Sequence, residues 1–258
     1  MRFVRIGRQL GLAGCLFVLL ALTLPASGQE YLPAWFLTPP QGLSVALFAS
    51  SEGAAKSDGA RILATYTRSI VWGDFQSLYD SSIDSEAWLN TEYYYYVDPE
   101  RVAKLEPQMA ILDSAVASIF PRMNFYLVGQ DGSAQINKEN ILTASLACPD
   151  WASSTGFERD GAIFGVGRCA TSGSIAAGWI KAEENAVFEL LMFQGTKIGT
   201  ITKATSIGSS ASLAKIEWIT LKYKLEGLRV IERWIDLENS LCMVLVSAPG
   251  DGIRRINE

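Results

Sequence analysis

Apolar and polar positions follow the most regular pattern in the second half of the chain, from residue 161 to residue 249. Residues 162–169 form a short, mostly apolar run, which is typical of a buried strand. From Ile175 to Phe193 apolar residues recur every three or four positions, which predicts a helix with one buried face. That face comprises Ile175, Trp179, Ala182, Ala186, Leu190 and Phe193. Glu183 and Glu184 lie off this face, and we expect them to face solvent.

Three more strands are expected after this helix. Beyond Gly195 a run of β-branched residues fits either a helix or a strand. Leu213–Leu225, Leu228–Ile235 and Leu241–Ala248 have the composition of strands, and the polar cluster 236–240 has the length of a hairpin turn. An order of strand, helix and three strands predicts an antiparallel sheet with one long helix packed across a face.

The first half shows the same order more faintly. Leu43–Ser50 is predicted to be a buried strand, and small residues at helical spacing predict a helix from Gly53 to about Asp80. Trp88–Val97 is rich in aromatic residues that favour strands. Met109–Phe120 and Met123–Val128 read as a pair of strands, although the first of them also fits a helix.

Short matches in the same order link the two halves. Pro33-Ala34-Trp35 aligns with Pro149-Asp150-Trp151, and Phe125–Val128 aligns with Met243–Val246. The small residues of the two helices also align without a gap: Ala60, Ala64 and Gly73 with Ala182, Ala186 and Gly195. We interpret these matches as a tandem duplication. The predicted fold class is therefore α+β, with two tandem units that each hold an antiparallel sheet and one long helix.

The N-terminus has the features of a signal peptide. Arginines precede an apolar run from Leu10 to Leu24, and the small residues before Gln29 suit cleavage after Gly28. A retained anchor is the alternative, but the run is shorter than the about 20 apolar residues that span a membrane. Leu12-Ala13-Gly14-Cys15 matches the lipobox of acylated lipoproteins. It lies in the middle of the apolar run and not at its end, so we expect no lipid anchor.

These features divide the chain into four parts. Residues 1–28 are the predicted signal peptide and residues 29–130 the first, more divergent unit. Residues 131–160 are a predicted linker rich in Gly, Ser, Asn and Asp, and residues 161–258 are the second unit. We expect an exported protein, in the periplasm or associated with the outer envelope, with no integral membrane span after cleavage.

Charge argues against two classes of partner. The whole chain has 22 basic and 27 acidic residues, and the leader carries three of the arginines and no acid, so 19 basic and 27 acidic residues remain and give a formal charge of −8. Nucleic acids and anionic membrane surfaces are bound through clusters of lysine and arginine. We therefore expect neither as a partner.

The composition also limits the possible chemistry. The chain contains no histidine, which excludes Ser-His and Cys-His nucleophile pairs and the commonest zinc ligand sets. It has no Asp-x-Asp-x-Asp calcium motif and no Walker phosphate loop, and Gly165 and Gly167 fall inside a predicted strand, where glycine usually marks a close backbone approach or a bulge. We expect no cofactor, no metal site and no catalytic site.

One pair of carboxylates suggests an enzyme. Glu232 and Asp236 share a face of a predicted strand, as the two acids of a glycosidase must. The neighbouring Arg229 and Arg233 favour cross-strand ion pairs instead.

Three of the four cysteines follow the predicted leader: Cys148, Cys169 and Cys242. In an oxidising compartment they can form one disulfide in three ways. A Cys148–Cys169 bridge would fasten the linker to the first strand of the second unit. Three free thiols, packed as small apolar groups, are the alternative.

Tyr93, Tyr94, Tyr95 and Tyr96 form a possible interaction surface. Alternation along a strand puts Tyr93 and Tyr95 on one face and Tyr94 and Tyr96 on the other. Amphipathic aromatic residues are enriched at protein interfaces. A strand that is packed on both faces is the alternative.

The second unit resembles a known repeat. FGVG at residues 164–167 is followed by a helix containing AEENAVFEL and by the segment LRVIERWIDLENSLCMVLV. These motifs are similar to the repeat shared by the Lpp-twenty lipoprotein family and the N-terminal domain of the flagellar assembly protein FlgT. The likeness covers about Pro149–Pro249 and, more weakly, Pro33–Gly129.

The resemblance implies a bacterial cell-envelope protein of α+β fold, with surface-attached or flagellar-ring roles among its relatives and no catalytic residues to transfer. The chain departs from the family in lacking a lipobox at the end of its apolar run. We therefore expect an exported, non-enzymatic protein that binds envelope proteins or a cell-wall-associated assembly through sheet edges and the face between its two units. The alternative is an envelope hydrolase that acts on cell-wall or carbohydrate substrates through Glu232 and Asp236.

Overall fold

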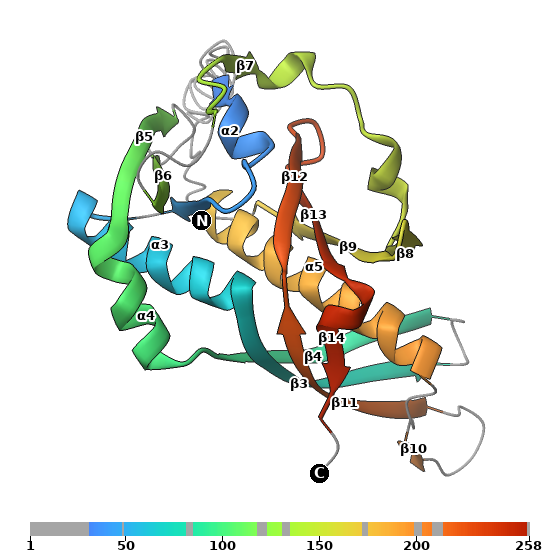
Figure 1. The fold of residues 1–258 in the computed structure, drawn as a ribbon. Helices are drawn as coiled ribbons and strands as arrows, with labels where there is room; N and C mark the ends of the chain where they lie inside the picture. Colours follow the sequence, from blue (N-terminus) through green and yellow to red (C-terminus); the bar gives the residue numbers. More distant parts are fainter. Residues whose placement is uncertain are drawn as a thin grey trace, which may run out of the picture.

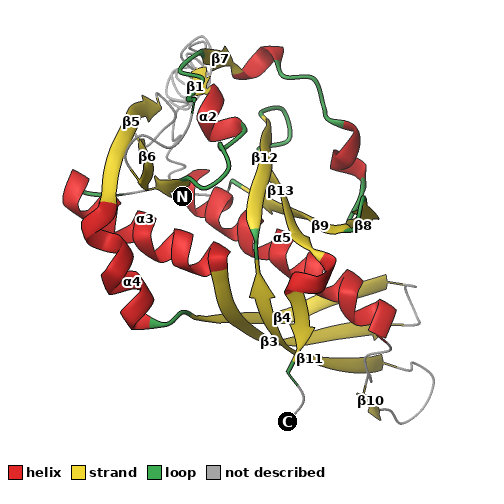
Figure 2. Cartoon of the chain, in the orientation of Figure 1, coloured by secondary structure: helices red, strands yellow, loops and turns green. Residues whose placement is uncertain are grey.

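The computed structural model describes most of the chain after the predicted leader. It covers residues 31–47, 49–80, 85–117, 123–130, 135–171, 175–198, 203–207 and 214–256. Over these residues the protein is a mixed α+β structure in which helices pack on antiparallel sheets (Figure 1, Figure 2), so the predicted fold class is confirmed. The predicted signal peptide lies outside the described residues. No helix among the described residues is long and apolar enough to cross a membrane.

The second half forms a four-stranded sheet with one long helix across a face. Its strands are β8 (Gly156–Arg159), β9 (Ala162–Ala170), β12 (Arg229–Asp236) and β13 (Leu241–Pro249), in the order β12-β13-β9-β8, and α5 (Ile175–Ile198) packs on β8, β9 and β13. The helix therefore continues three residues past Gly195. The predicted buried face is confirmed, because its central members are fully buried: Trp179, Ala182, Ala186 and Leu190.

Gly165 and Gly167 let α5 lie directly on β9. A Cβ atom at Gly165 would collide with the backbone of Ala186, and one at Gly167 would collide with the backbone of Ala182. The expected close approach of two backbones at these glycines is confirmed. Both glycines therefore serve the packing of helix on strand.

The first half holds a three-stranded sheet whose strands follow the same order as β9, β13 and β12 of the second half. β2 (Ser44–Leu47), β6 (Met123–Gln130) and β5 (Met109–Ala117) are neighbours in the order β2-β6-β5, and α3 (Glu52–Thr67) packs on them. A shorter helix, α4 (Pro99–Leu105), packs beside α3. The segment of β5 is therefore a strand and not a helix.

The predicted helix from Gly53 to Asp80 is wrong beyond Thr67. The chain continues there as β3 (Arg68–Asp80), which pairs with β4 (Ser85–Tyr96). Residues 70–72 are Ile, Val and Trp, which favour strands, and pairing along both edges of β3 outweighs the helical spacing of its small residues. Gly73 lies in this strand while Gly195 lies in α5, so that part of the alignment between the halves is wrong.

A third sheet is built from both halves. β11 (Ala214–Glu226) pairs with β3 along its whole length, from Ala214 opposite Asp80 to Glu226 opposite Arg68. β10 (Lys203–Ile207) and β14 (Ile253–Arg255) also pair with β11. Figure 1 shows α5 passing across this shared sheet, whereas α3 lies beside it and leads directly into β3. The predicted unit boundaries at residues 130 and 161 stay a prediction.

An N-terminal aromatic residue ties the helix-bearing sheets together. The ring of Phe36, in α2 (Ala34–Leu37), lies 4.5 Å from that of Phe125 on β6 and 5.3 Å from that of Trp179 on α5, measured between centroids. β1 (Tyr31–Pro33) leads into α2 and pairs with β7 (Asn140–Leu142) of the predicted linker. The two halves therefore share one hydrophobic core.

The two helix-bearing sheets also share fine detail. A bulge precedes Asp113 on β5, and a bulge precedes Glu232 on β12. Each of these acids accepts an indole N–H, Asp113 from Trp35 at 3.1 Å and Glu232 from Trp151 at 2.7 Å. These tryptophans belong to the two triplets that align in the sequence. The agreement is compatible with the predicted tandem duplication.

Candidate functional site

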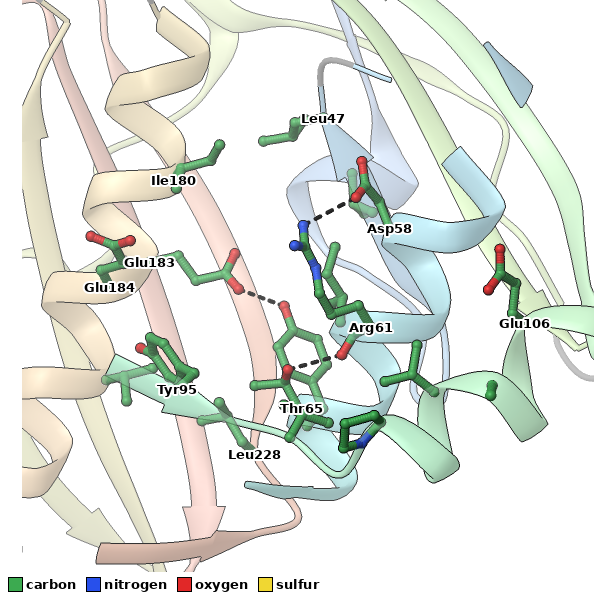
Figure 3. Close-up of a pocket in the computed structure, with 18 residues that line it drawn as sticks. Leu47, Asp58, Arg61, Thr65, Tyr95, Glu106, Ile180, Glu183, Glu184 and Leu228 are labelled. Carbon is green, nitrogen blue, oxygen red and sulfur yellow. Dashed lines mark hydrogen bonds and ion pairs between the residues drawn. The ribbon is translucent and has the colours of Figure 1, made fainter. Parts of the chain in front are cut away.

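A cavity of about 840 Å³ lies between the two halves. α3 and α4 of the first half form one side of it and α5 of the second half forms the other, while the end of β4 contributes Tyr95 (Figure 3). Binding sites for small molecules measure roughly 300–1,000 Å³ and favour junctions of this kind. The cavity is therefore the candidate functional site.

Helical spacing brings the lining side chains together. The lining residues of α3 lie one, three or four positions apart, as do those of α5, so each helix turns one face to the cavity. These residues are Asp58, Arg61, Ile62, Thr65 and Tyr66 on α3, and Ile180, Glu183, Glu184 and Val187 on α5. Other elements add further apolar side chains to the lining: Val45, Leu47, Val97, Pro99, Val102, Ala103 and Leu228.

Beside this cavity lie an ion pair within the second half and a hydrogen bond that crosses to the first half. Arg233 of β12 is only 3% exposed, and its Nη2 donates to Oε2 of Glu183 at 3.2 Å. The hydroxyl of Tyr66 donates to Oε1 of the same carboxylate at 2.6 Å. Both oxygens of Glu183 are thus engaged, which links α3, α5 and β12 through one side chain.

Arg233 also contacts the N-terminal segment. Its Nη1 donates to the carbonyl oxygen of Phe36 at 2.9 Å, and its Cζ lies 4.9 Å from the centre of the Phe36 ring. Removing a guanidinium from water is costly, so a buried arginine needs such partners. Arg233 therefore connects three elements beside the cavity: β12, α5 and α2.

Two tyrosines beside these carboxylates stay protonated. Burial raises the pKa of Tyr66 well above its usual value, and the negative charge of Glu183 is the second cause of this rise. Burial, followed by the charges of Glu184 and Glu183, also raises the pKa of Tyr95. Both phenols can donate hydrogen bonds, and both present neutral aromatic rings at the cavity.

Acidic groups outnumber basic ones among the described lining residues. The carboxylates are those of Asp58, Glu106, Glu183 and Glu184. Arg61 is the basic residue of the lining, and its Nη2 lies 3.0 Å from Oδ1 of Asp58. Lys181, which is not part of the lining, lies 3.1 Å from Glu184. With Arg233 and Lys181 counted beside Arg61, three cations face four carboxylates, so the cavity combines apolar walls with a small excess of negative charge.

The predicted tyrosine surface is divided between two faces. Tyr94 and Tyr96 are 44% and 52% exposed, whereas Tyr95 lines the cavity. Tyr94 stacks on Trp72, with ring centroids 5.5 Å apart. Tyr93 belongs to β4, but its side chain lies outside the described part of the structure. The expected alternation is seen for Tyr94, Tyr95 and Tyr96, and an interaction through the exposed pair stays a prediction.

The two carboxylates of the hydrolase alternative have structural partners. Glu232 accepts the indole N–H of Trp151. Asp236 accepts the backbone N–H of Asn239 at 2.9 Å and its side-chain amide at 2.7 Å, within the β12–β13 turn. Neither acid lines the cavity.

The expected ion pairs of these acids with Arg229 and Arg233 are not formed in the described structure. Arg229 donates to Oγ of Ser247 at 3.2 Å, and Arg233 points into the core toward Glu183. The bulge before Glu232 adds a residue to β12 and thereby changes which side chains face inward. Alternation alone does not predict that change.

Cys148, Cys169 and Cys242 are all free, so the predicted Cys148–Cys169 bridge is not formed. Cys148 is exposed, Cys169 is half-buried and Cys242 is buried. The strand register places Cys169 of β9 directly opposite Cys242 of β13. Strand pairing therefore favours Cys242 over Cys148 as the partner of Cys169.

Sequence reasoning missed the cluster of Tyr66, Glu183 and Arg233. Helical periodicity assigns Glu183 to a solvated face, and nothing local marks Tyr66. One signal was present, because alternation places Arg233 on the same face of a predicted strand as Ile231 and Ile235, where a buried charge needs a partner. Only the folded structure, which brings Arg233 of β12 to Glu183 of α5, shows which residue that partner is.

Comparisons with known proteins found no match: no family model matches the chain, and neither does any curated protein or solved structure. In the described part of the chain, no three Cys, Asp or Glu side chains are grouped closely enough to hold a metal ion. The resemblance to the Lpp-twenty and FlgT repeat therefore stays an expectation that rests on its quoted motifs.

Proposed function

We propose that the protein is an exported, non-enzymatic component of the bacterial cell envelope that acts by binding. The observation that supports this proposal is the cavity of about 840 Å³, which takes its walls from both halves. The buried link from Arg233 through Glu183 to Tyr66 fixes those walls relative to one another. A preformed cavity with few, fixed polar groups is the usual form of a binding site.

An outer surface supports a role in assembly with another envelope protein. Tyr94 and Tyr96 expose their rings on the face of the shared sheet opposite to Tyr95. Exposed tyrosines supply much of the energy of protein interfaces. The leader and the resemblance to envelope repeats support the location that this role requires.

The hydrolase alternative gains no support from the geometry of Glu232 and Asp236. A glycosidase needs two carboxylates on opposite sides of one substrate-binding cleft. Here Glu232 accepts a hydrogen bond from Trp151 and Asp236 accepts one from Asn239, and both acids lie outside the cavity lining. Their removal is expected to affect stability and not a reaction.

Photo-crosslinking in living cells tests the proposal. A photoreactive amino acid at the position of Ala103, which lines the cavity from α4, is compared with one at the exposed Ala177 of α5, outside the lining. We expect one reproducible envelope adduct from Ala103 and none of the same mass from Ala177. The N-terminus of the recovered protein is expected to be Gln29. Identical adducts at both positions, or none, would contradict the proposal.

A further inference from the structure

We infer that the cavity binds a ligand that joins an apolar body to a cationic group, as an alkylammonium does. The inference rests on the proposed binding function and adds the chemical class of the ligand. Three features of the lining carry it: its apolar walls, its excess of carboxylates and its two neutral aromatic rings.

The apolar walls favour a ligand with an apolar body. Side chains of both halves supply them, among them Leu47, Ile62, Val102, Val187 and Leu228. Burying apolar surface against such walls is favourable in proportion to the area removed from water. A small, fully charged ligand would leave these side chains without a partner.

The carboxylates favour a ligand with a positive charge. The basic groups near them already have partners. Arg61 forms an ion pair with Asp58, and Arg233 donates hydrogen bonds to Glu183 and to the carbonyl oxygen of Phe36. The ion pair between Lys181 and Glu184 is about one-third exposed on both sides, 38% and 35%, so a ligand cation can compete for Glu184. An anionic ligand would meet carboxylates from α3, from α5 and from Glu106, the residue that follows α4.

The tyrosines favour the same charge. Figure 3 shows Tyr95 beside Glu183 and Glu184, and Tyr66 donates its hydroxyl to Glu183. The face of an aromatic ring attracts cations, most strongly where water is excluded. Two carboxylates, Glu183 and Glu184, and two aromatic rings are thus gathered on one side of an apolar cavity, which is the combination that an ammonium with an apolar tail requires.

A series of three ligands with the same octyl chain tests the charge. Isothermal titration calorimetry on the protein without its leader measures octyltrimethylammonium, octanol and octanoate at concentrations below micelle formation. We expect the cation to bind at least about tenfold more tightly than the anion, with the alcohol between them. Equal affinities, or tighter binding of octanoate, would overturn the inference.

Matched variants test the place of binding. Ala103→Trp fills the cavity from α4 and is expected to weaken binding of the cation at least about tenfold, whereas Ala177→Trp leaves it unchanged. Glu184→Gln removes one lining charge and is expected to weaken it about threefold or more, whereas Glu238→Gln in the exposed β12–β13 turn does not. Circular dichroism confirms that each variant is folded.

The outcomes separate this inference from the proposed function. If the cation binds equally well to the Ala103→Trp variant, it does not bind in the cavity and the inference fails. If none of the three ligands binds while crosslinking from Ala103 still yields a specific adduct, the ligand class is wrong and the binding function stands. If crosslinking fails as well, both are wrong.

Discussion

Trp151 donates its indole N–H to the carboxylate of Glu232, 81 residues away in sequence, at 2.7 Å. The bond joins the segment that precedes the second sheet to the residue after the bulge of β12. Trp35 and Asp113 form the corresponding bond in the first half. A pair of glycosidase acids was one interpretation of this region, and the hydrogen bond gives Glu232 a structural role instead.

Loss of this bond is expected to destabilise the fold. In Glu232→Ala the partly buried indole N–H loses its charged acceptor, which costs about 1–3 kcal/mol of the free energy of unfolding. Glu232→Gln keeps an acceptor and is expected to cost less. Urea unfolding followed by tryptophan fluorescence measures both, with Glu238→Ala in the exposed turn as the control. A Glu232→Ala variant as stable as the control would contradict the structural role.

Gly167→Ala is expected to be among the most damaging small substitutions. The added Cβ would meet backbone atoms of Ala182 and Ala186, which cannot move without displacing α5 from β9. We expect a loss of about 3 kcal/mol or more, or failure to fold. Gly53→Ala is the matched control, because the exposed first turn of α3 has room for a methyl group. Its expected effect is opposite in sign, a gain of about 0.5–1 kcal/mol.

The Arg233–Glu183 pair is expected to be strongly coupled. Glu183→Gln leaves a buried guanidinium without its carboxylate, and Arg233→Met leaves a partly buried carboxylate without its cation. Each change is expected to cost about 2–4 kcal/mol, and the double variant much less than their sum. A double-mutant cycle by thermal or urea unfolding measures this coupling. Strictly additive costs would show that the pair contributes no coupling energy.

Glu189 is expected to make stability depend on pH. Burial raises the pKa of this α5 carboxyl, with a smaller opposing effect of Arg168. Between the ordinary value near 4.3 and the raised one, the folded protein binds more protons than the unfolded chain, so stability falls as pH rises. Glu189→Gln is therefore expected to be more stable than the native protein at pH 7, and equally stable below about pH 4. Urea unfolding of both proteins at pH 7 and below about pH 4 measures this. A difference in the free energy of unfolding between variant and native protein that is the same at both pH values would contradict a role of the Glu189 charge.

The three thiols are expected to react in the order Cys148, Cys169, Cys242. Cys148 is exposed, burial raises the pKa of Cys169, and burial together with Cys169 raises the pKa of Cys242 to about 12. A thiol with a raised pKa supplies little thiolate at neutral pH, so alkylation is slow. Mass spectrometry of protein treated with iodoacetamide for increasing times gives the three rates. Faster labelling of Cys242 than of Cys148 would contradict the burial of Cys242.

Oxidation provides a related measurement on the same residues. Residues directly opposite each other in an antiparallel pair have Cα atoms about 4.5–5.5 Å apart, within the range of disulfides. With oxidised glutathione as the oxidant, the bridge is expected between Cys169 and Cys242, and peptide mapping without reduction identifies it. A bridge between Cys148 and Cys169 would restore the pairing considered from the sequence.

Local patterns predicted what depends on neighbours in sequence. The buried face of α5 follows from apolar spacing alone, and the glycines of β9 follow from the need for a close approach. The end of α3 did not follow, because residues 68–80 become a strand through pairing with β11, which is distant in sequence. The same holds for the cavity, since Tyr66, Glu183 and Arg233 meet only after three separate elements have packed.

The pairing of β3 with β11 has a consequence for the order of folding. The partners are separated by the whole segment between Asp80 and Ala214, so the first strand is made long before its neighbour. Contacts of such long range form slowly, and an unpaired strand edge invites pairing with other chains. Until β11 has been made, β3 therefore keeps one edge unpaired, and pairing with other chains competes most strongly with folding at that stage.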